Sequence, residues 1–301
     1  MALNILIEAS GSLVCGYMID AIQRAGHRAV ASDIDTQAVG RHLADDFIQV
    51  PSATDPDLWP RRESLLIEHR IDMVIPSIDE TLLGWATRKR ALADTGITTC
   101  LSDEAVIQTF SDKWLSYQFF RAHDIPTPNS SLEQLYPMIK PRFGRGGRGV
   151  GITSNPIEMT GLLSQEVVHG TEYTVDVLCA PSGAPIYIVP RRRIGVRDGK
   201  STGGIVECRA DVIHIVRRLC ESAHFIGPIN VQCFVQLDGT VTVIEVNPRI
   251  AGGMALGFAA TENWIPLLCR MLRNGEVPAP REVRDGLRMH RYYAEIFVPA
   301  D

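Results

Sequence analysis

The stretch Val-Thr-Val-Ile-Glu-Val-Asn-Pro-Arg-Ile-Ala-Gly-Gly, residues 241–253, decides how the rest of the chain is interpreted. Its aliphatic residues predict a buried β-strand, and Glu245 and Asn247, two positions apart, are expected to point to one face. Pro248 ends the strand, and Arg249 follows it as a fixed cation. Mg²⁺ takes few hard protein ligands and keeps positions for water and phosphate, so a carboxylate beside an amide oxygen suits it. The alternative is a strand with a polar face that runs into an Asn-Pro turn.

A second apolar run lies just upstream, Gly-Pro-Ile-Asn-Val-Gln-Cys-Phe-Val at residues 227–235, and it carries Gln232. The sequence Leu-Asp-Gly-Thr at 237–240 separates the two runs and is typical of a tight β-hairpin turn. The two strands are therefore expected to be antiparallel, with Gln232 near Glu245.

Composition sets the limits for the rest of the chain. With 301 residues and 45% hydrophobic content, the chain can bury a large core and is expected to form two domains, or one domain with subdomains. A net charge of -5 argues against a general nucleic-acid or acidic-membrane binder. The seven cysteines include no C-x-x-C pair and are interpreted as buried free thiols in a reducing compartment. Because the N-terminus has no basic leader and no apolar run is long enough to span a bilayer, we expect a cytoplasmic protein.

The first hundred residues alternate short apolar runs with helical segments. Strands are expected at 4–7, 27–32, 47–50, 73–76 and 97–100, with helices at 15–25, 58–69 and 81–93. This order predicts a parallel, doubly wound sheet, in which ligands bind at the carboxyl ends of the strands. The polar residues expected at those ends are Ser10, Gly11, Asp33, Asp35, Ser77, Asp79 and Glu80. The turn at Gly11 lacks the G-x-G-x-x-G spacing and a Walker lysine, so most of these residues, taken singly, are expected to be helix caps and loop ends.

Two lysines and a glycine-rich loop come next. Lys113 stands at the head of an expected helix, where a cation is disfavoured unless it faces a bound anion; the alternative is a solvated lysine. Lys140 lies in a strand-like segment that leads into Phe-Gly-Arg-Gly-Gly-Arg-Gly-Val-Gly, residues 143–151. A loop with so few Cβ atoms can lay its N–H groups against phosphate oxygens. The alternatives are a flexible hairpin or a short Arg-Gly tract that contacts RNA.

The segment Gln-Glu-Val-Val-His-Gly-Thr-Glu, residues 165–172, leads into an expected alternating strand. Its backbone from Gln165 to Val168 could offer donors and acceptors to a purine edge. The Glu172 carboxylate could meet ribose hydroxyls.

The order of these elements resembles the ATP-grasp superfamily, and Glu-x-Asn-Pro-Arg together with Asn-Val-Gln is the most specific part of the resemblance. It is closest to the branch that contains the large subunit of carbamoyl phosphate synthase and small stand-alone carboxylate–amine ligases, and it covers essentially the whole chain. It implies an α/β fold, α+β in the C-terminal part. A Rossmann-like domain at 1–100 would precede a two-lobed ATP-grasp domain at 101–301, with a small lobe at about 113–182 and a large lobe at about 183–301.

Carried over position by position, the resemblance implies a bound ATP. The lysines would bind the α- and β-phosphates, the glycine loop would close over the triphosphate, and residues 165–168 would contact adenine. The residues implied in nucleotide binding are Lys113, Lys140, Gly144, Gly146, Gly147, Gln165, Glu166, Val168 and Glu172.

The resemblance also implies a metal site and a catalytic arginine. Gln232, Glu245 and Asn247 would hold Mg²⁺, for which Mn²⁺ can substitute, and Arg249 would stabilise charge on the transferring phosphoryl group. Gln232 is neutral where the family often has Glu, so the number of metals, one or two, is left open.

An arginine-rich segment lies where relatives of this fold contact substrate. We expect Arg191 and Arg193 to contribute to catalysis, with one of them facing the site and the other facing solvent. Arg192 and Arg197 fit a solvated basic edge equally well. Residues 287–295 are expected to form a final strand with alternating polar residues and no catalytic histidine.

The resulting hypothesis is an ATP-dependent carboxylate–amine ligase that forms an amide through an acyl phosphate and releases ADP and phosphate. Its expected partners are a small carboxylate and a small amine, both amino-acid-like, with no nucleic acid or membrane and with a homodimer as a further possibility. One alternative is a bicarbonate-dependent enzyme that works through carboxyphosphate. A catalytically silent ATP-binding protein is the other.

Overall fold

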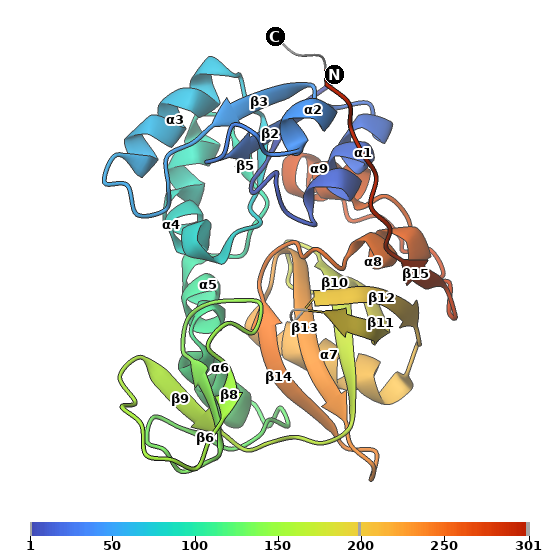
Figure 1. The fold of residues 1–301 in the computed structure, drawn as a ribbon. Coiled ribbons are helices and arrows are strands. Elements are labelled where there is room, and N and C mark those ends of the chain that lie inside the picture. Colours follow the sequence, from blue (N-terminus) through green and yellow to red (C-terminus); the bar gives the residue numbers. More distant parts are fainter. Residues whose placement is uncertain (1, 198–199, 299–301) are drawn as a thin grey trace.

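The computed structural model describes residues 2–197 and 200–298. This part of the chain contains a five-stranded, a four-stranded and a six-stranded sheet. Figure 1 shows the five-stranded sheet with its helices at the top, and the other two sheets side by side below it.

The five-stranded sheet is parallel and has the order β3-β2-β1-β4-β5. Its side chains alternate between two cores: Ile5 and Ile7 pack in one cluster, whereas Leu6 packs in the other. Helices cover both faces, which confirms the expected doubly wound arrangement. The elements are β1 (Asn4–Ile7), α1 (Cys15–Arg24), β2 (Arg28–Asp33), α2 (Gly40–Leu43), β3 (Asp46–Gln49), α3 (Leu58–Glu68), β4 (Met73–Ile75), α4 (Asp79–Asp94) and β5 (Thr98–Thr99).

The four-stranded sheet is antiparallel and has the order β6-β9-β7-β8. Two helices precede it, and the second begins at Lys113 as expected. The elements are α5 (Glu104–Ser111), α6 (Lys113–Ala122), β6 (Ser130–Ser131), β7 (Met138–Pro141), β8 (Gly151–Ile152) and β9 (Leu162–Gln165).

The six-stranded sheet is antiparallel and has the order β14-β13-β10-β11-β12-β15. Helices α5, α6 and α7 cover one face through a cluster that includes Phe110, Phe120 and Val216. Helices α8 and α9 share a second cluster with α1 and β1, which fixes the first domain against this sheet. The elements are β10 (Thr171–Cys179), β11 (Pro185–Arg197), β12 (Lys200–Val206), α7 (Ala210–Ala223), β13 (Gly227–Val235), β14 (Val241–Asn247), α8 (Ala255–Ala260), α9 (Trp264–Asn274) and β15 (Arg288–His290).

Two expectations about this sheet need correction. β10 is buried on both faces rather than alternating, because Val175 and Val177 pack under α7 whereas Thr174 and Asp176 are buried on the opposite face. The expected final strand at 287–295 is much shorter, because β15 pairs with β12 over only three residues.

β10 belongs to the six-stranded sheet, although the expected small lobe of about 113–182 includes its residues. Because β10 pairs with β11 and β13, the four-stranded sheet ends with β9. We propose that the boundary between the lobes lies between β9 and β10.

No helix among residues 2–197 and 200–298 combines the length and apolar character that a membrane crossing needs.

Candidate functional site

The predicted hairpin of β13 and β14 is present, and it places four oxygen-bearing side chains on one face. Gln232 pairs with Glu245, and Asn230 pairs with Asn247, so the expected neighbourhood of Gln232 and Glu245 is confirmed. The intervening Val231 and Val246 point into the core under α7. The polar face of the hairpin is therefore turned away from that core.

The two lysines come together beside this face. Lys113 Nζ lies 3.5 Å from Glu245 Oε1 and donates a hydrogen bond to the Gly144 carbonyl at 2.8 Å. Lys140 Nζ donates to Gln165 Oε1 at 2.9 Å, and both of these side chains are buried. Burial lowers the pKa of Lys140 to about 8, the nearby Glu245 raises it, and Lys113 lowers it further. Residues from α6, β7, β9 and β14 thus form one cationic cluster around a carboxylate.

An N-cap orients the first lysine. Asp112 accepts a hydrogen bond from Trp114 N at 2.8 Å and pairs with the Arg142 guanidinium at the end of β7. The Lys113 N–H donates to the Arg142 carbonyl at 3.0 Å. The start of α6 is therefore tied to β7, which explains why Lys113 and Lys140 meet.

The glycine-rich loop connects β7 to β8 and needs its glycines for conformation. Gly144, Gly146, Gly147 and Gly149 have φ angles of 113°, 68°, 70° and 71°, which L-residues with a Cβ rarely adopt. At Gly144, Gly146 and Gly147 a Cβ would meet no atom within 4 Å, so the requirement there is the backbone angle and not crowding.

The link between β9 and β10 is the segment expected to contact adenine. The Glu166 carboxylate accepts hydrogen bonds from Asn129 N at 2.9 Å and Asn129 Nδ2 at 3.0 Å, and Glu166 N donates to Asn129 O at 3.0 Å. Glu166 therefore joins the two connections between the lobes, and its carboxylate is engaged by protein. The Val168 N–H has no partner among the described residues, so it is open to a ligand acceptor.

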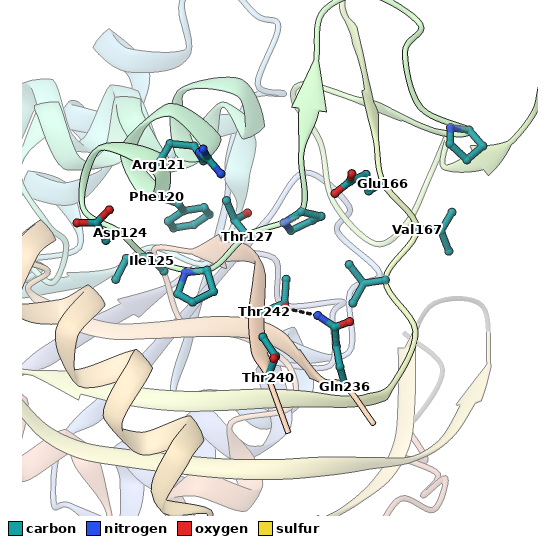
Figure 2. A pocket seen from close by; sticks show the side chains of 14 residues that line it. Phe120, Arg121, Asp124, Ile125, Thr127, Glu166, Val167, Gln236, Thr240 and Thr242 are labelled. Atoms are coloured by element: carbon teal, nitrogen blue, oxygen red, sulfur yellow. Dashed lines mark hydrogen bonds between the residues drawn. The ribbon is translucent and has the colours of Figure 1, made fainter. Parts of the chain in front are cut away.

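A pocket of about 720 Å³ opens beside this link. Figure 2 shows it between the end of α6, the loop that leads to β6, the link itself and the β13–β14 hairpin. Glu166 and Val168 line it, but the two lysines and Gln232, Glu245 and Asn247 do not. The pocket is therefore adjacent to the expected adenine contact and separate from the cationic cluster.

The arginines of β11 correct the expected alternation. Residues two apart on a strand share a face, and Arg191 and Arg193 both face the Asp176 and Glu172 side of β10. Neither guanidinium is turned to solvent, since Arg191 is buried and the Arg193 side chain is 13% exposed. Arg192 faces the other way and pairs with Glu207 at 2.7 Å, whereas the side chain of Arg197 lies outside the described residues.

Glu172 does not stand alone on β10. Its carboxylate pairs with Arg193 Nη1 on the neighbouring strand. A ribose that reached Glu172 would therefore meet an ion pair and not a single carboxylate.

Arg249 is held by a residue of the first domain. Its Nε and Nη2 lie 2.9 and 2.5 Å from the two carboxylate oxygens of Asp79, the first residue of α4. Arg249 Nη2 also lies 3.3 Å from Asn247 Oδ1, which connects the Arg249–Asp79 pair to the polar face of the hairpin. Asp79 is one of the residues expected at the strand ends, but the sequence did not indicate its partner.

A buried polar network lies next to the polar face of the hairpin. Asp176 accepts from Asn230 Nδ2 and from Arg191 Nε, both at 2.8 Å. A Cβ on Gly253 would lie 2.2 Å from Arg191 Nη2, so only glycine allows this contact. The network thus fixes Arg191 close to the loop that follows Arg249.

Arg291 is a candidate that sequence reasoning missed. Its Nη2 donates to the Gly252 carbonyl at 2.5 Å, while its buried Nε has no hydrogen-bond partner among the described residues. Burial lowers the pKa of Arg291, and the nearby Arg191 lowers it further. Tyr17 of α1, whose hydroxyl donates to Ala251 O at 2.8 Å, borders the same group. A weak signal was present, since Arg291 lies within the final strand expected at 287–295.

Most other polar residues at the strand ends serve the first domain itself. Asp33 accepts from Gly11 N at 2.9 Å and from Asp35 N at 3.1 Å, as expected of loop ends. Ser77 donates from its N and its Oγ to the buried Glu8 at 3.2 and 2.8 Å. Ser77 thus anchors the turn that leads to α4.

The donor set fits Mg²⁺ bound together with phosphates. The polar face offers the Glu245 carboxylate and the Asn247 and Gln232 amides, and the described residues include no group of three or more His, Cys, Asp or Glu that could hold a metal alone. Mg²⁺ usually binds through one or two carboxylates plus substrate phosphates, and the two lysines beside Glu245 supply the matching positive charge.

Known proteins match this chain at the level of family and fold. Residues 158–294 match the family model described as ATP-grasp in the biosynthetic pathway with Ter operon. The arginine-specific large chain of carbamoyl phosphate synthase from Halalkalibacterium halodurans is 25% identical over 247 residues, which are 68% of this chain and 23% of the relative. The chain thus spans about a quarter of the length of that relative.

Solved structures show the same fold. The biotin carboxylase domain dimer of 2-oxoglutarate carboxylase from Hydrogenobacter thermophilus, in complex with MgADP, ADP and bicarbonate, has a TM-score of 0.75 at 18% identity, over 96% of this chain and 73% of that one. The N5-carboxyaminoimidazole synthetase from Staphylococcus aureus complexed with ADP has a TM-score of 0.74 at 17% identity, over 96% and 82%. The motif order, the three sheets and these matches support an ATP-grasp protein similar to the large chain of carbamoyl phosphate synthase.

Proposed function

We propose that the protein is an ATP-dependent carboxylate–amine ligase that releases ADP and phosphate. The observation that carries the proposal is the convergence of Lys113, Lys140 and Glu245 on the polar face of the hairpin. Arg249 lies next to this face and binds the Asp79 carboxylate. Phosphoryl transfer depends mainly on positioning and charge neutralisation, and this arrangement offers both.

The chemistry divides into two steps. An oxygen of the acid would attack the γ-phosphorus of ATP, so that ADP leaves and an acyl phosphate forms. The amine nitrogen would then attack the acyl carbon, phosphate would leave, and the amide would form with loss of a proton from nitrogen. Glu245, Asn247 and Gln232 would hold Mg²⁺, which neutralises phosphate charge.

Each cationic residue has a role in this proposal. Lys113 and Lys140 would contact the phosphates of the nucleotide, and the glycine loop would cover them. Arg249 would receive the acid and later the charge on the acyl phosphate, with Arg191 and Arg193 on the substrate side.

Nucleotide affinity is expected to fall as the pH rises through 8. The pKa of Lys140 is lowered to about 8, so its positive charge is present at pH 7 and mostly lost at pH 9. The Kd of ADP should therefore rise about tenfold between pH 7 and pH 9, the limit for loss of one bound proton. Isothermal titration across this range tests the effect. Adenosine, which has no phosphate, is the matched control, and equal pH profiles for both ligands would contradict the role of Lys140.

Product analysis tests the reaction class. Purified protein with Mg²⁺ and ATP would be assayed against panels of acids and amines, with nucleotide products separated by chromatography. We expect ADP and phosphate in an acid-dependent reaction. AMP and pyrophosphate would reject the proposal, as would the absence of acid-dependent turnover across the panels.

A second candidate is a bicarbonate-dependent reaction through carboxyphosphate. It is favoured by the sequence relative, which is a carbamoyl phosphate synthase chain. Phosphate release that requires bicarbonate, and that is lost in degassed buffer with no added acid, would select this candidate over the ligase.

A further inference from the structure

We propose that Asp79 is a specificity-determining residue of the acid site. Its carboxylate fills the bidentate fork of Arg249, and an acid substrate can replace it only by bringing another carboxylate. The proposal rests on the proposed role of Arg249 as the receiver of the acid substrate.

The contacts of Arg249 show what an incoming acid must displace. Nε and Nη2, the two donors on one edge of the guanidinium, lie 2.9 and 2.5 Å from the Asp79 oxygens. Arg249 also donates from Nη2 to Asn247 Oδ1 at 3.3 Å and from Nη1 to the Ile250 carbonyl at 3.1 Å. A second carboxylate can therefore gain the bidentate geometry on that edge only by taking the place of Asp79.

Burial decides which ligands can make the exchange. Arg249 is 9% exposed, and a buried guanidinium left without an anion is strongly destabilised. A carboxylate ligand brings the same negative charge and the same two acceptor oxygens as Asp79, so the free energy of Arg249 changes little in the exchange. A neutral ligand, or a ligand with a single acceptor oxygen, would leave the charge of the Arg249 guanidinium without a bidentate anion. Such a ligand therefore does not replace Asp79.

Asp79 has a second partner to which it can turn. It is the first residue of the 16-residue helix α4, where the N-terminal N–H groups favour a carboxylate. Arg145 of the glycine loop lies close, with its Nε 3.8 Å from Asp79 Oδ2 and 3.4 Å from Glu80 Oε1.

This geometry connects the acid site to the glycine loop. When an acid takes Arg249, Asp79 is released to pair fully with Arg145, and the loop is held more firmly against α4. Acid binding and closure of the loop over the triphosphate then favour one another.

Limited digestion with trypsin tests the exchange, since Arg145 must leave its partners to enter the protease. Formate is the carboxylate probe, and sodium chloride at equal ionic strength controls for screening. The readout, measured by mass spectrometry, is the ratio of cleavage after Arg145 to cleavage after Arg148. Arg148 is a loop arginine whose side chain has no partner among the described residues. In the wild-type chain, formate is expected to lower this ratio about twofold, because it strengthens one exposed ion pair, that between Arg145 and Asp79.

Variants separate exchange from a general effect on the loop. Asp79→Asn keeps the shape but loses the charge, so its ratio should start higher and should not respond to formate. Glu80→Gln should also start higher but keep the response. Glu63→Gln is the control: Glu63 lies on α3 and pairs with Arg88, away from the glycine loop. This variant should behave as the wild type.

The proposal is overturned if formate and chloride have equal effects on the wild type, or if Asp79→Asn responds to formate as the wild type does. The assay needs no turnover, so its failure leaves the ADP-forming reaction untouched. A chain that responds to formate but forms no ADP with any acid would instead reject the proposed function.

Discussion

Replacing Glu245 with alanine is expected to lower acid-dependent ADP formation at least about a hundredfold, because the hairpin loses its only proposed metal carboxylate. Glu245 lies 3.5 Å from Lys113 and raises the pKa of Lys140, so its loss also removes the anion that balances the two lysines. Steady-state kinetics with saturating Mg²⁺ and ATP measure the effect, and circular dichroism checks that the fold is intact.

The control for this variant is Glu276→Ala, which removes an exposed carboxylate paired with Arg270. It should retain full activity. Retention of more than a tenth of the activity by a folded Glu245→Ala protein would contradict the proposed metal site, whereas loss of nucleotide affinity alone would indicate a binding protein.

Replacing Arg62 with methionine is expected to lower the free energy of unfolding by about 3–5 kcal/mol, the usual effect of breaking a buried ion pair from one side. Arg62 pairs with Glu8, and both are almost fully buried within the first domain. Glu8 also accepts hydrogen bonds from Ser77 N and Thr81 Oγ1 at 3.2 and 3.1 Å. Urea denaturation followed by tryptophan fluorescence measures the change, since Trp59 and Trp85 flank Arg62.

The double variant Glu8→Gln with Arg62→Met is the matched control. Glutamine keeps a side-chain acceptor for Ser77 and Thr81 without a buried charge, so the double variant should be more stable than Arg62→Met alone. Equal destabilisation of both would show that packing against the tryptophans, and not the charge on Glu8, dominates.

Local patterns predicted much of this structure, because hairpins and strand faces depend on neighbouring residues. The Asp-Gly turn predicted the antiparallel hairpin, and an irregularity between Gln232 and Cys233, which the sequence did not indicate, shifts the register so that Gln232 lies opposite Glu245. The head of α6 at Lys113 was also visible, since Asp112 is a favourable N-cap. These features determine the polar face and part of the cationic cluster.

Contacts between residues far apart in the chain could not be predicted from a single sequence. Asp79 and Arg249 are 170 positions apart, and neither residue carries a local sign of the other. The same holds for Arg291, which reaches the loop after Arg249 only because β15 pairs with β12. Tertiary pairing of strands, and not propensity, places these groups.

The error at Arg191 and Arg193 has a different origin. The two-residue period of a strand puts them on one face, so the expectation of opposite faces misapplied a rule that the sequence itself supplies. β10 misled in another way, because its sequence keeps polar residues at every second position although two of them, Thr174 and Asp176, are buried.

The proposed nucleotide and metal site can be tested with a crystal structure of the protein bound to Mg²⁺ and a non-hydrolysable ATP analogue. We expect a polyphosphate between Lys113, Lys140 and the glycine loop, with Mg²⁺ bound by Glu245 and Asn247. A nucleotide seated elsewhere, with the side chains of Gln232, Glu245 and Asn247 turned away from its phosphates, would contradict it.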